Sequence, residues 1–398
     1  MSLSVADRIK GFRISGALLY EVAFIYCFTV AFLQTTLFTA FFDKGLFRYL
    51  LMIGLLLVLF KVFFLDQQSI RTFCFNLIVL AILALTWRKA SDFTMLTMGV
   101  FVIGARGVDF RRIVRDYFIV GIILLVGTIL CSQLGIIKNL VYTRFGTNIR
   151  RQSFGIVYPT DFAAHVVYLF LAYCYLRFKR LSWPTYLAAI IAALAVYKLC
   201  DARFDTLALL VLVPVLFIGK RAYYGHPNSY FIASFYWTIP VIFAYITQVC
   251  AYFYSPHNHL LSSINKGLSG RLALSHQAFS QYGLSLFGKH VIEHGWGNAS
   301  GLQMFLNNPG RYFYIDSSFI RVLIMYGIIV ALMLLVTMTI ISWRSVTKGS
   351  FALASILVVV SLSAVVEQHL FDLGFDPFLL ALFANVYSNQ SFIKGDQS

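Results

Sequence analysis

A long polar stretch, residues 255–326, carries most of the side chains that could do chemistry in this chain. Between Ser255 and Asp316 it holds five of the eight histidines and four cations but only two acids. Arg271 and His276 lie near its middle, and Asp316 begins an Asp-Ser-Ser run that leads into an apolar segment. A cation suits an anionic group, and a carboxylate or an imidazole can accept a proton. A loop of this length without a strand pattern is more often a functional element than a connector.

The rest of the chain is strongly apolar. The whole chain of 398 residues is 60% hydrophobic and 12% charged, with a mean hydropathy of +0.79, which leaves too little polar surface for a soluble protein. The apolar residues run in blocks of about twenty and do not alternate, so the sequence predicts an all-α polytopic membrane protein and not a β-barrel. We expect a single integral membrane domain over 1–398 with about twelve transmembrane helices, near 17–41, 46–65, 72–87, 92–105, 117–137, 160–177, 183–199, 204–219, 229–252, 317–343, 351–367 and 370–388.

Basic loops orient these predicted spans. They follow the fourth, sixth, eighth and tenth spans and contain Arg106, Arg111, Arg112, Arg115, Arg177, Lys179, Arg180, Lys220, Arg221, Arg344 and Lys348. Such loops favour the cytoplasmic side, so we expect both termini in the cytoplasm and the long loop, residues 253–316, on the outer side. A short basic start with Arg8, Lys10 and Arg13 precedes the first span, and no small-residue cleavage pattern follows it, so no cleaved leader is expected.

Several further cations then fall on the outer face, where the topological rule does not call for them. They are Lys138, Arg144, Arg150, Arg151, Lys198, Arg203 and Arg271. Contact with outer-leaflet headgroups is one explanation. The other is a lipid-linked diphosphate, because the planar fork of an arginine matches phosphate oxygens. We favour the diphosphate, because separate loops present arginine at one membrane surface.

The sixth predicted span begins with a polar helix start. Tyr158 and Pro159 precede Asp161, and Pro159 is well placed to begin the helix, whose dipole favours an anion there. His165 lies one turn further in. A histidine at such a position is commonly a satisfied packing residue, although a histidine inside a span is also a functional candidate.

Two acids flank an arginine at the start of the eighth predicted span. Asp201 and Asp205 are four residues apart, which places them on one helix face if the helix begins that early. A local ion pair with Arg203 is the simple alternative. We favour a cavity, because charges buried at the edge of a bilayer are costly unless they face one.

The long loop offers two candidates for a general base. A weakly amphipathic helix over 271–283 would lie on the membrane, and Arg271 and His276, five residues apart, would not share its face well. Asp316 either caps the helix that follows or faces the substrate. The aromatic residues Tyr312, Phe313 and Tyr314 suit either a membrane interface or stacking on a sugar. Two histidines at His257 and His259 make too weak a metal site to predict one.

Together these residues resemble the bacterial Wzy-type polysaccharide polymerases, which form one superfamily with the O-antigen ligases. The recurring elements are an arginine-rich outer loop before a proline, an arginine at the outer end of a later span, a Gly-Arg pair, and an Asp-Ser-Ser element with a downstream glycine. Here they are Arg144 to Pro159, Arg203, Gly270-Arg271, and Asp316 to Phe319 with Gly327. The amino-acid sequences of the last two elements, around Arg271 and Asp316, look most like those of exopolysaccharide and capsule polymerases of Gram-positive bacteria. The resemblance covers residues 140–330.

The resemblance implies a metal-independent inverting glycosyltransferase of the integral-membrane C type, without a cofactor, in the bacterial cytoplasmic membrane. It would polymerise undecaprenyl-diphosphate-linked repeat units by transfer to a sugar hydroxyl of another lipid-linked unit. A flippase and a chain-length regulator of the same pathway would be partners. By this resemblance Arg203 and Arg271 hold the diphosphate, supported by Arg144 and Arg151. Asp316 falls where the ligases carry a histidine thought to activate the acceptor, and His276 is the reserve. Asp161, His165, Asp201, Tyr158, Ser317 and Arg321 are supporting residues.

Other functions remain open from the sequence. A ligase that transfers glycan to another acceptor would share these motifs. A flippase or another transporter would show internal repeats and charges at mid-membrane, whereas these charges gather at one surface. The net charge of +16 would suggest a nucleic-acid partner for a soluble chain. Here much of this charge lies in the predicted cytoplasmic loops and in the predicted outer loops, so no nucleic-acid partner is expected.

Overall fold

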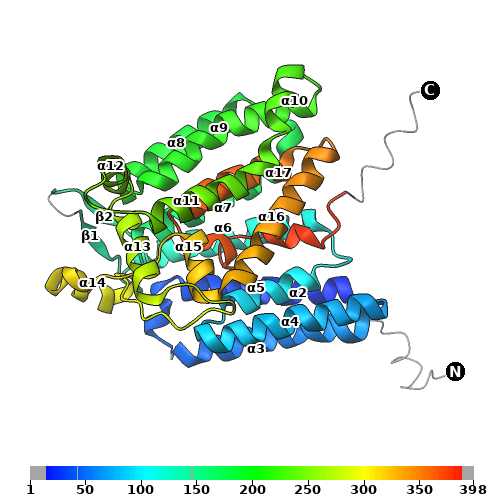
Figure 1. Cartoon of the computed structure of the whole chain (residues 1–398), viewed down its shortest axis with the longest axis horizontal. Helices are drawn as coiled ribbons and strands as arrows, with labels where there is room; N and C mark the ends of the chain where they lie inside the picture. The colour runs from blue at the N-terminus through cyan, green and yellow to red at the C-terminus, as the bar shows by residue number, and fades with distance from the viewer. Residues whose placement is uncertain (1–14, 43, 145–146, 388–398) are drawn as a thin grey trace.

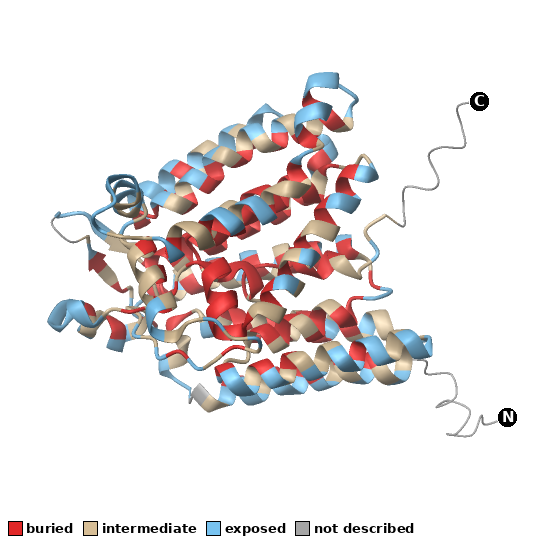
Figure 2. Cartoon of the chain, in the orientation of Figure 1, coloured by how far each residue is buried: buried red, intermediate tan, exposed pale blue. Residues whose placement is uncertain are grey.

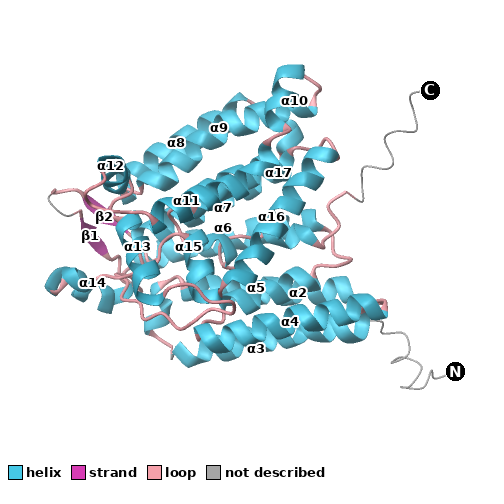
Figure 3. Cartoon of the chain, viewed as in Figure 1, coloured by secondary structure: helices cyan, strands magenta, loops and turns pink. Residues whose placement is uncertain are grey.

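The computed structural model describes residues 15–42, 44–144 and 147–387. Helices make up most of this part of the chain (Figures 1 and 3). Its two strands, β1 (Val141–Thr143) and β2 (Arg150–Gln152), form one short antiparallel hairpin. The basic start with Arg8, Lys10 and Arg13 lies outside the described residues.

The helices follow one another with few long interruptions. The α-helices are α2 (Gly16–Gln34), α3 (Lys44–Phe60), α4 (Ile70–Ala90), α5 (Thr94–Gly104), α6 (Phe110–Gln133), α7 (Pro159–Leu176), α8 (Trp183–Cys200), α9 (Arg203–Tyr223), α10 (Pro227–Ala233), α11 (Ile239–Tyr252), α12 (His259–Gly267), α13 (Arg271–Tyr282), α14 (Asn298–Asn307), α15 (Ser318–Arg321), α16 (Ile328–Thr347) and α17 (Ala352–Ala364). Short 3-10 or π turns are η1 (Leu37–Ala40), η2 (Lys61–Leu65), η3 (Phe178–Arg180), η4 (Tyr236–Thr238), η5 (Pro309–Arg311), η6 (Val322–Tyr326), η7 (His369–Phe371) and η8 (Phe378–Leu382).

Among the described residues, eight helices are long and apolar enough to cross a membrane. Inside a bilayer only intra-helical bonding satisfies every backbone polar group of a single segment, so such helices are the form that this composition favours. The prediction of a polytopic α-helical membrane protein is therefore confirmed at this level. The predicted number of about twelve spans is not, because α5 and α17 are shorter and α7 is not among the eight.

The tenth predicted span, 317–343, is broken. Its first part is α15 and the π turn η6, and the long helix α16 begins only at Ile328. Gly327 lies between them with φ +91 and ψ 170, a conformation that only glycine adopts readily. The loop backbone packs directly here, since the Lys289 N–H donates to the Met325 carbonyl oxygen at 3.0 Å. A Cβ on Gly327 would overlap Leu286 and Gly288.

The twelfth predicted span, 370–388, is not a long helix over its described residues. It contains only the short turns η7 and η8. The side chains of Asp372 and Asp376 accept the N–H groups of Gly374 and Phe378, which favours turns over a continuous helix. Most of the segment is buried, so its apolar composition reflects packing inside the protein.

The buried residues gather in the middle of the molecule, around α7, α15 and α17 (Figure 2). α4 is the least buried of the eight long helices and lies at the periphery with α3. The long loop carries α12, α13 and α14, which lie at the same end of the molecule as the β1–β2 hairpin (left in Figure 1). This end also holds the first turns of α7 and α9, so separate parts of the chain meet there.

Candidate active site

A cavity of about 930 Å³ opens at this end of the molecule. Its walls come from the hairpin region, the first turns of α7 and α9, the start of α13, and the segments 293–298, 312–316 and 367–368. All four arginines predicted to bind a diphosphate line it, namely Arg144, Arg151, Arg203 and Arg271. Tyr158, Asp161, Asp201 and Asp316 line it as well. The structure therefore brings together predicted residues that are up to 172 positions apart in the sequence (316 − 144).

One group of cations surrounds Asp201. This aspartate ends α8 with φ +46 and is buried, so it does not share a helix face with Asp205, as the early helix start would have required. Arg144 donates from Nε to its carboxylate and from Nη2 to its carbonyl oxygen at 3.0 Å. Arg203 Nε lies 3.5 Å from the other carboxylate oxygen. The local ion pair thus exists, and it also faces the cavity.

Arg151 completes this group, which we call the arginine cluster (Arg144, Arg151 and Arg203). Arg151 donates to the Cys200 carbonyl oxygen at 2.9 Å and to the Tyr158 hydroxyl at 3.2 Å. Two of the three guanidinium groups, those of Arg144 and Arg203, thus share the carboxylate of Asp201. Because Arg203 is half-exposed and holds only a long contact, it keeps donors for an anion in the cavity.

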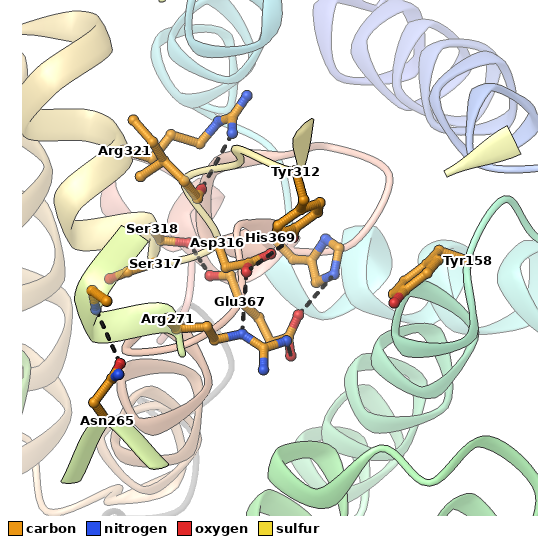
Figure 4. Close-up of polar contacts among 12 residues, drawn as sticks. Tyr158, Asn265, Arg271, Tyr312, Asp316, Ser317, Ser318, Arg321, Glu367 and His369 are labelled. Atoms are coloured by element: carbon orange, nitrogen blue, oxygen red, sulfur yellow. Dashed lines mark hydrogen bonds and ion pairs between the residues drawn. The ribbon is translucent and has the colours of Figure 1, made fainter. Parts of the chain in front are cut away.

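A second group centres on Arg271, which is held between two carboxylates (Figure 4). Arg271 Nε lies 3.3 Å from Asp316 Oδ2, and its Nη2 lies 3.4 Å from Glu367 Oε1. The Tyr312 hydroxyl donates to Asp316 Oδ2 at 3.3 Å. The guanidinium also lies over the ring of Phe204, 5.6 Å from its centroid. We call Arg271, Asp316 and Glu367 the carboxylate cluster.

Further acids lie beside the carboxylate cluster. The buried His369 places Nε2 3.5 Å from Asp161 Oδ1 and 3.9 Å from Glu367 Oε2. Asp205 also lines the cavity and is buried, and its Oδ2 has no hydrogen-bond partner among the described residues. The cavity therefore holds two groups of charges, one rich in carboxylates around Arg271 and one rich in arginine around Asp201.

The Asp-Ser-Ser run holds the carboxylate cluster together. Asp316 does not cap α15, because the N-cap residue is Ser317. The Ser317 side chain makes no capping hydrogen bond. Ser317 instead donates to the Ala364 carbonyl oxygen at 3.2 Å, and Ser318 Oγ donates to the Glu367 carbonyl oxygen at 2.6 Å. The two serines fix the backbone that carries Glu367, while the Asp316 side chain points toward Arg271 (Figure 4) and lines the cavity.

Arg321 acts from behind the cavity wall. It makes a two-pronged ion pair with Glu293, with N–O distances of 2.9 and 2.7 Å, and it lies over the ring of Tyr314, 4.9 Å from the centroid. Glu293 also accepts the Ile315 N–H at 2.9 Å. This pair ties the segment that carries Asp316 to the segment that carries Trp296, another residue of the cavity wall.

Two predicted histidines do not reach the cavity. His276 lies on another side of α13, where its Nδ1 is 2.9 Å from the Ala251 carbonyl oxygen. His165 is buried in α7, 2.8 Å from the Thr35 hydroxyl, and stacks on Phe375. Both are satisfied packing residues in this structure. Asp316, not His276, is the predicted base that faces the cavity.

Glu367 and His369 did not enter the sequence-based site. An acid at the end of the eleventh predicted span was a usable signal, because ionisable residues near membrane depth commonly face a cavity. Nothing in the sequence paired Glu367 with Arg271, 96 residues away. Asp205 also lines the cavity. The sequence predicted that it faces a cavity but gave it no role in the site.

Burial changes the proton affinity of both acids that contact Arg271. It raises the pKa of Asp316 above its usual value, while Arg271 opposes the rise. Glu367 lies beyond the end of α17, and burial raises its pKa to about 7, again against Arg271. A carboxyl group whose pKa approaches neutrality is a better proton acceptor than an exposed one.

Comparison of the chain with protein-family models gave no match, and neither did searches of curated proteins and of solved structures. The geometry of the cavity therefore carries the functional argument.

Proposed function

We propose that this membrane protein is a glycosyltransferase of the integral-membrane C type that transfers a glycan from a polyprenyl diphosphate to a sugar hydroxyl of a second lipid-linked unit. The observation that carries the proposal is the division of one cavity into the arginine cluster and the carboxylate cluster. A donor that brings its own diphosphate leaving group needs cations at one end and a proton acceptor at the other.

The arginine cluster would hold the diphosphate. Arg203 is its most exposed member. Arg144 is fixed by the Asp201 carbonyl oxygen. Arg151 is fixed by the Cys200 carbonyl oxygen and the Tyr158 hydroxyl. Fixed donors stabilise the negative charge that grows on the departing oxygen without having to reorganise. Arg271 lines the same cavity but already has two carboxylate partners, so its main part would be to position them and to face the reacting centre between the two clusters.

The carboxylate cluster would receive the acceptor. The acceptor hydroxyl would give its proton to Asp316 while its oxygen forms the new bond to the anomeric carbon, and the bond from that carbon to the diphosphate oxygen would break on the opposite face. Attack from the opposite face inverts the configuration. Tyr312 and Trp296, whose rings lie 4.1 Å apart, and Tyr314 give this end aromatic surfaces suited to a sugar.

The proposal includes a place in a pathway of surface-glycan polymerisation. Together with the basic loops, it puts the cavity on the outer face of a bacterial cytoplasmic membrane and both termini in the cytoplasm. The resemblance to Wzy-type polymerases supports polymerisation of undecaprenyl-diphosphate-linked repeat units into exopolysaccharide or capsule. A flippase that delivers the units and a chain-length regulator would be its partners.

The test is deletion of the gene in its native host, with analysis of surface glycan length and of the lipid-linked species that accumulate. We expect long glycan to disappear and single lipid-linked repeats to build up, with rescue by the wild-type gene and not by Arg203→Ala. His276→Ala is the matched control, because His276 lies in the same loop but not at the cavity, and it should restore full length. Unchanged glycan length after deletion would refute the proposal.

A further inference from the structure

A second cavity, of about 620 Å³, lies at the opposite end of the helix bundle. It is formed where α6 begins, where α7 and α9 end, and where α17 begins. We call it the basic pocket. Of the described residues that line it, the cations are Arg111, Arg177, Lys179 and Arg180, and the one acid is Asp109.

Within the part of the chain that the structure describes, the cations of the basic pocket have no carboxylate partners. Among residues 15–42, 44–144 and 147–387, none of the four forms an ion pair with a carboxylate. Arg111 donates to the Leu176 carbonyl oxygen at 2.6 Å, and Lys179 lies over the ring of Tyr223, 5.1 Å from its centroid. Asp109 is occupied as the N-cap of α6. Four cations around a cavity with one engaged acid favour an anionic ligand.

The inner wall of the pocket is largely apolar. Tyr175, Leu176, Phe178, Leu353 and Val386 line it beside the cations. A ligand with a charged head and an apolar body fits such a pocket better than a small hydrated anion does, because the apolar wall gains nothing from a hydrated ion.

The distance between the two cavities matches a bilayer. α7 runs from Asp161 in the first cavity to Leu176 in the basic pocket, and α9 runs from Asp205 to Tyr223. At 1.5 Å per residue these separations are about 22 and 27 Å. The hydrocarbon core of a bilayer is about 30 Å thick. In a membrane that these helices cross, the basic pocket would lie near the headgroup level of the leaflet opposite the candidate active site.

From this placement we infer that the basic pocket binds the phosphate headgroup of an anionic phospholipid, with Arg177 and Arg180 at the phosphate and the apolar wall against the start of an acyl chain. Basic pockets between helices at this depth suit anionic headgroups. This inference does not depend on the proposed glycosyl transfer. The simpler explanation, that these cations serve only to orient the protein, predicts no saturable site.

The test measures lipid binding by the purified full chain in detergent. Phosphatidylglycerol is titrated against phosphatidylcholine, and bound lipid is counted by native mass spectrometry. We expect saturable binding that prefers phosphatidylglycerol. In Arg177→Gln/Arg180→Gln it should weaken about tenfold or more, since each basic residue near an anionic headgroup contributes a factor of about five. The control Arg112→Gln/Arg221→Gln removes two charges from the same end without touching the pocket and should change binding by less than a factor of about two.

Equal weakening in the two double variants would overturn the inference in favour of a general surface charge. Unchanged binding in Arg177→Gln/Arg180→Gln would also overturn it, because the cations of the pocket would then not hold the headgroup. Displacement of phosphatidylglycerol by millimolar inorganic phosphate would overturn it in favour of a soluble phosphate. A photoactivatable phosphatidylglycerol on the wild-type protein needs no variant to fold. Labelling of residues 175–180 or 350–353 supports the pocket, and labelling confined to other surfaces contradicts it.

Discussion

Replacing Asp316 by asparagine separates the proposed role of this residue as a proton acceptor from its role in the structure. The substitution keeps the shape of the side chain and removes the charge and the proton-accepting oxygen. Because Asp316 does not cap α15, no helix cap is lost. Arg271 keeps Glu367 at 3.4 Å, so its charge stays paired.

The expected cost in stability is therefore smaller than for a fully broken ion pair. Removing a partner from a buried pair costs about 3–5 kcal/mol when the other charge is left alone. With Glu367 in place and an amide still available to Tyr312, we expect about 1.5–3 kcal/mol, the contribution of one hydrogen bond to a charged group. Loss of a general base slows a reaction by about 10²- to 10⁴-fold. The rate of transfer should fall far more than the stability does.

The assay follows extension of lipid-linked repeats by purified protein, with thermal unfolding of the same samples. Ser317→Ala is a matched control, because Ser317 is the next residue and its hydroxyl donates to the backbone carbonyl oxygen of Ala364. It should lose some stability and keep most of its rate. If Asp316→Asn extends repeats within about fivefold of the wild-type rate, Asp316 is not the base.

Three further predictions follow from the same geometry. Arg203→Ala should abolish extension while the protein still inserts, and Arg203→Lys should rescue only in part, because a point charge lacks the planar fork; extension assays on purified protein check both. The rate should fall as the pH drops through about 7. Burial raises the pKa of Glu367 to about 7, so below that pH Glu367 gains a proton and no longer pairs with Arg271. The pH dependence in this range should vanish in Glu367→Gln, which a pH–rate profile of both proteins checks. Gly327→Ala should lower the melting temperature by an amount that reflects about 2 kcal/mol or more, whereas Gly310→Ala, where a Cβ meets no atom within 4 Å, should not.

The helical membrane architecture could be predicted from the sequence, and eight of the twelve predicted site residues line the cavity. Arg144 and Arg203 stand near the ends of apolar segments on the predicted outer face, and Arg271 lies in the long loop on the same predicted face, so the sequence predicts all three at one level. Asp316 was predicted from its motif, and the structure adds that its side chain contacts Arg271 and leaves the helix start uncapped.

The remaining features depend on tertiary packing, which local patterns do not encode. The pairing of Glu367 with Arg271 joins segments 96 residues apart. His276 follows Arg271 on the same helix but faces the Ala251 carbonyl oxygen, because α13 turns that side toward α11. Hydropathy read 370–388 as a span, since residues buried in a protein and residues buried in lipid are equally apolar. The break at Gly327 comes from a loop backbone that packs against it.

The most direct test of the proposed transfer uses the purified chain with lipid-linked repeat units from its native host. We predict a ladder of longer glycans on lipid, with one polyprenyl diphosphate released per bond formed and an inverted configuration at each new linkage. Arg203→Ala and Asp316→Asn should each make no ladder under the same conditions. A wild-type protein that leaves the repeats single, or that forms new linkages with retained configuration, would contradict the account.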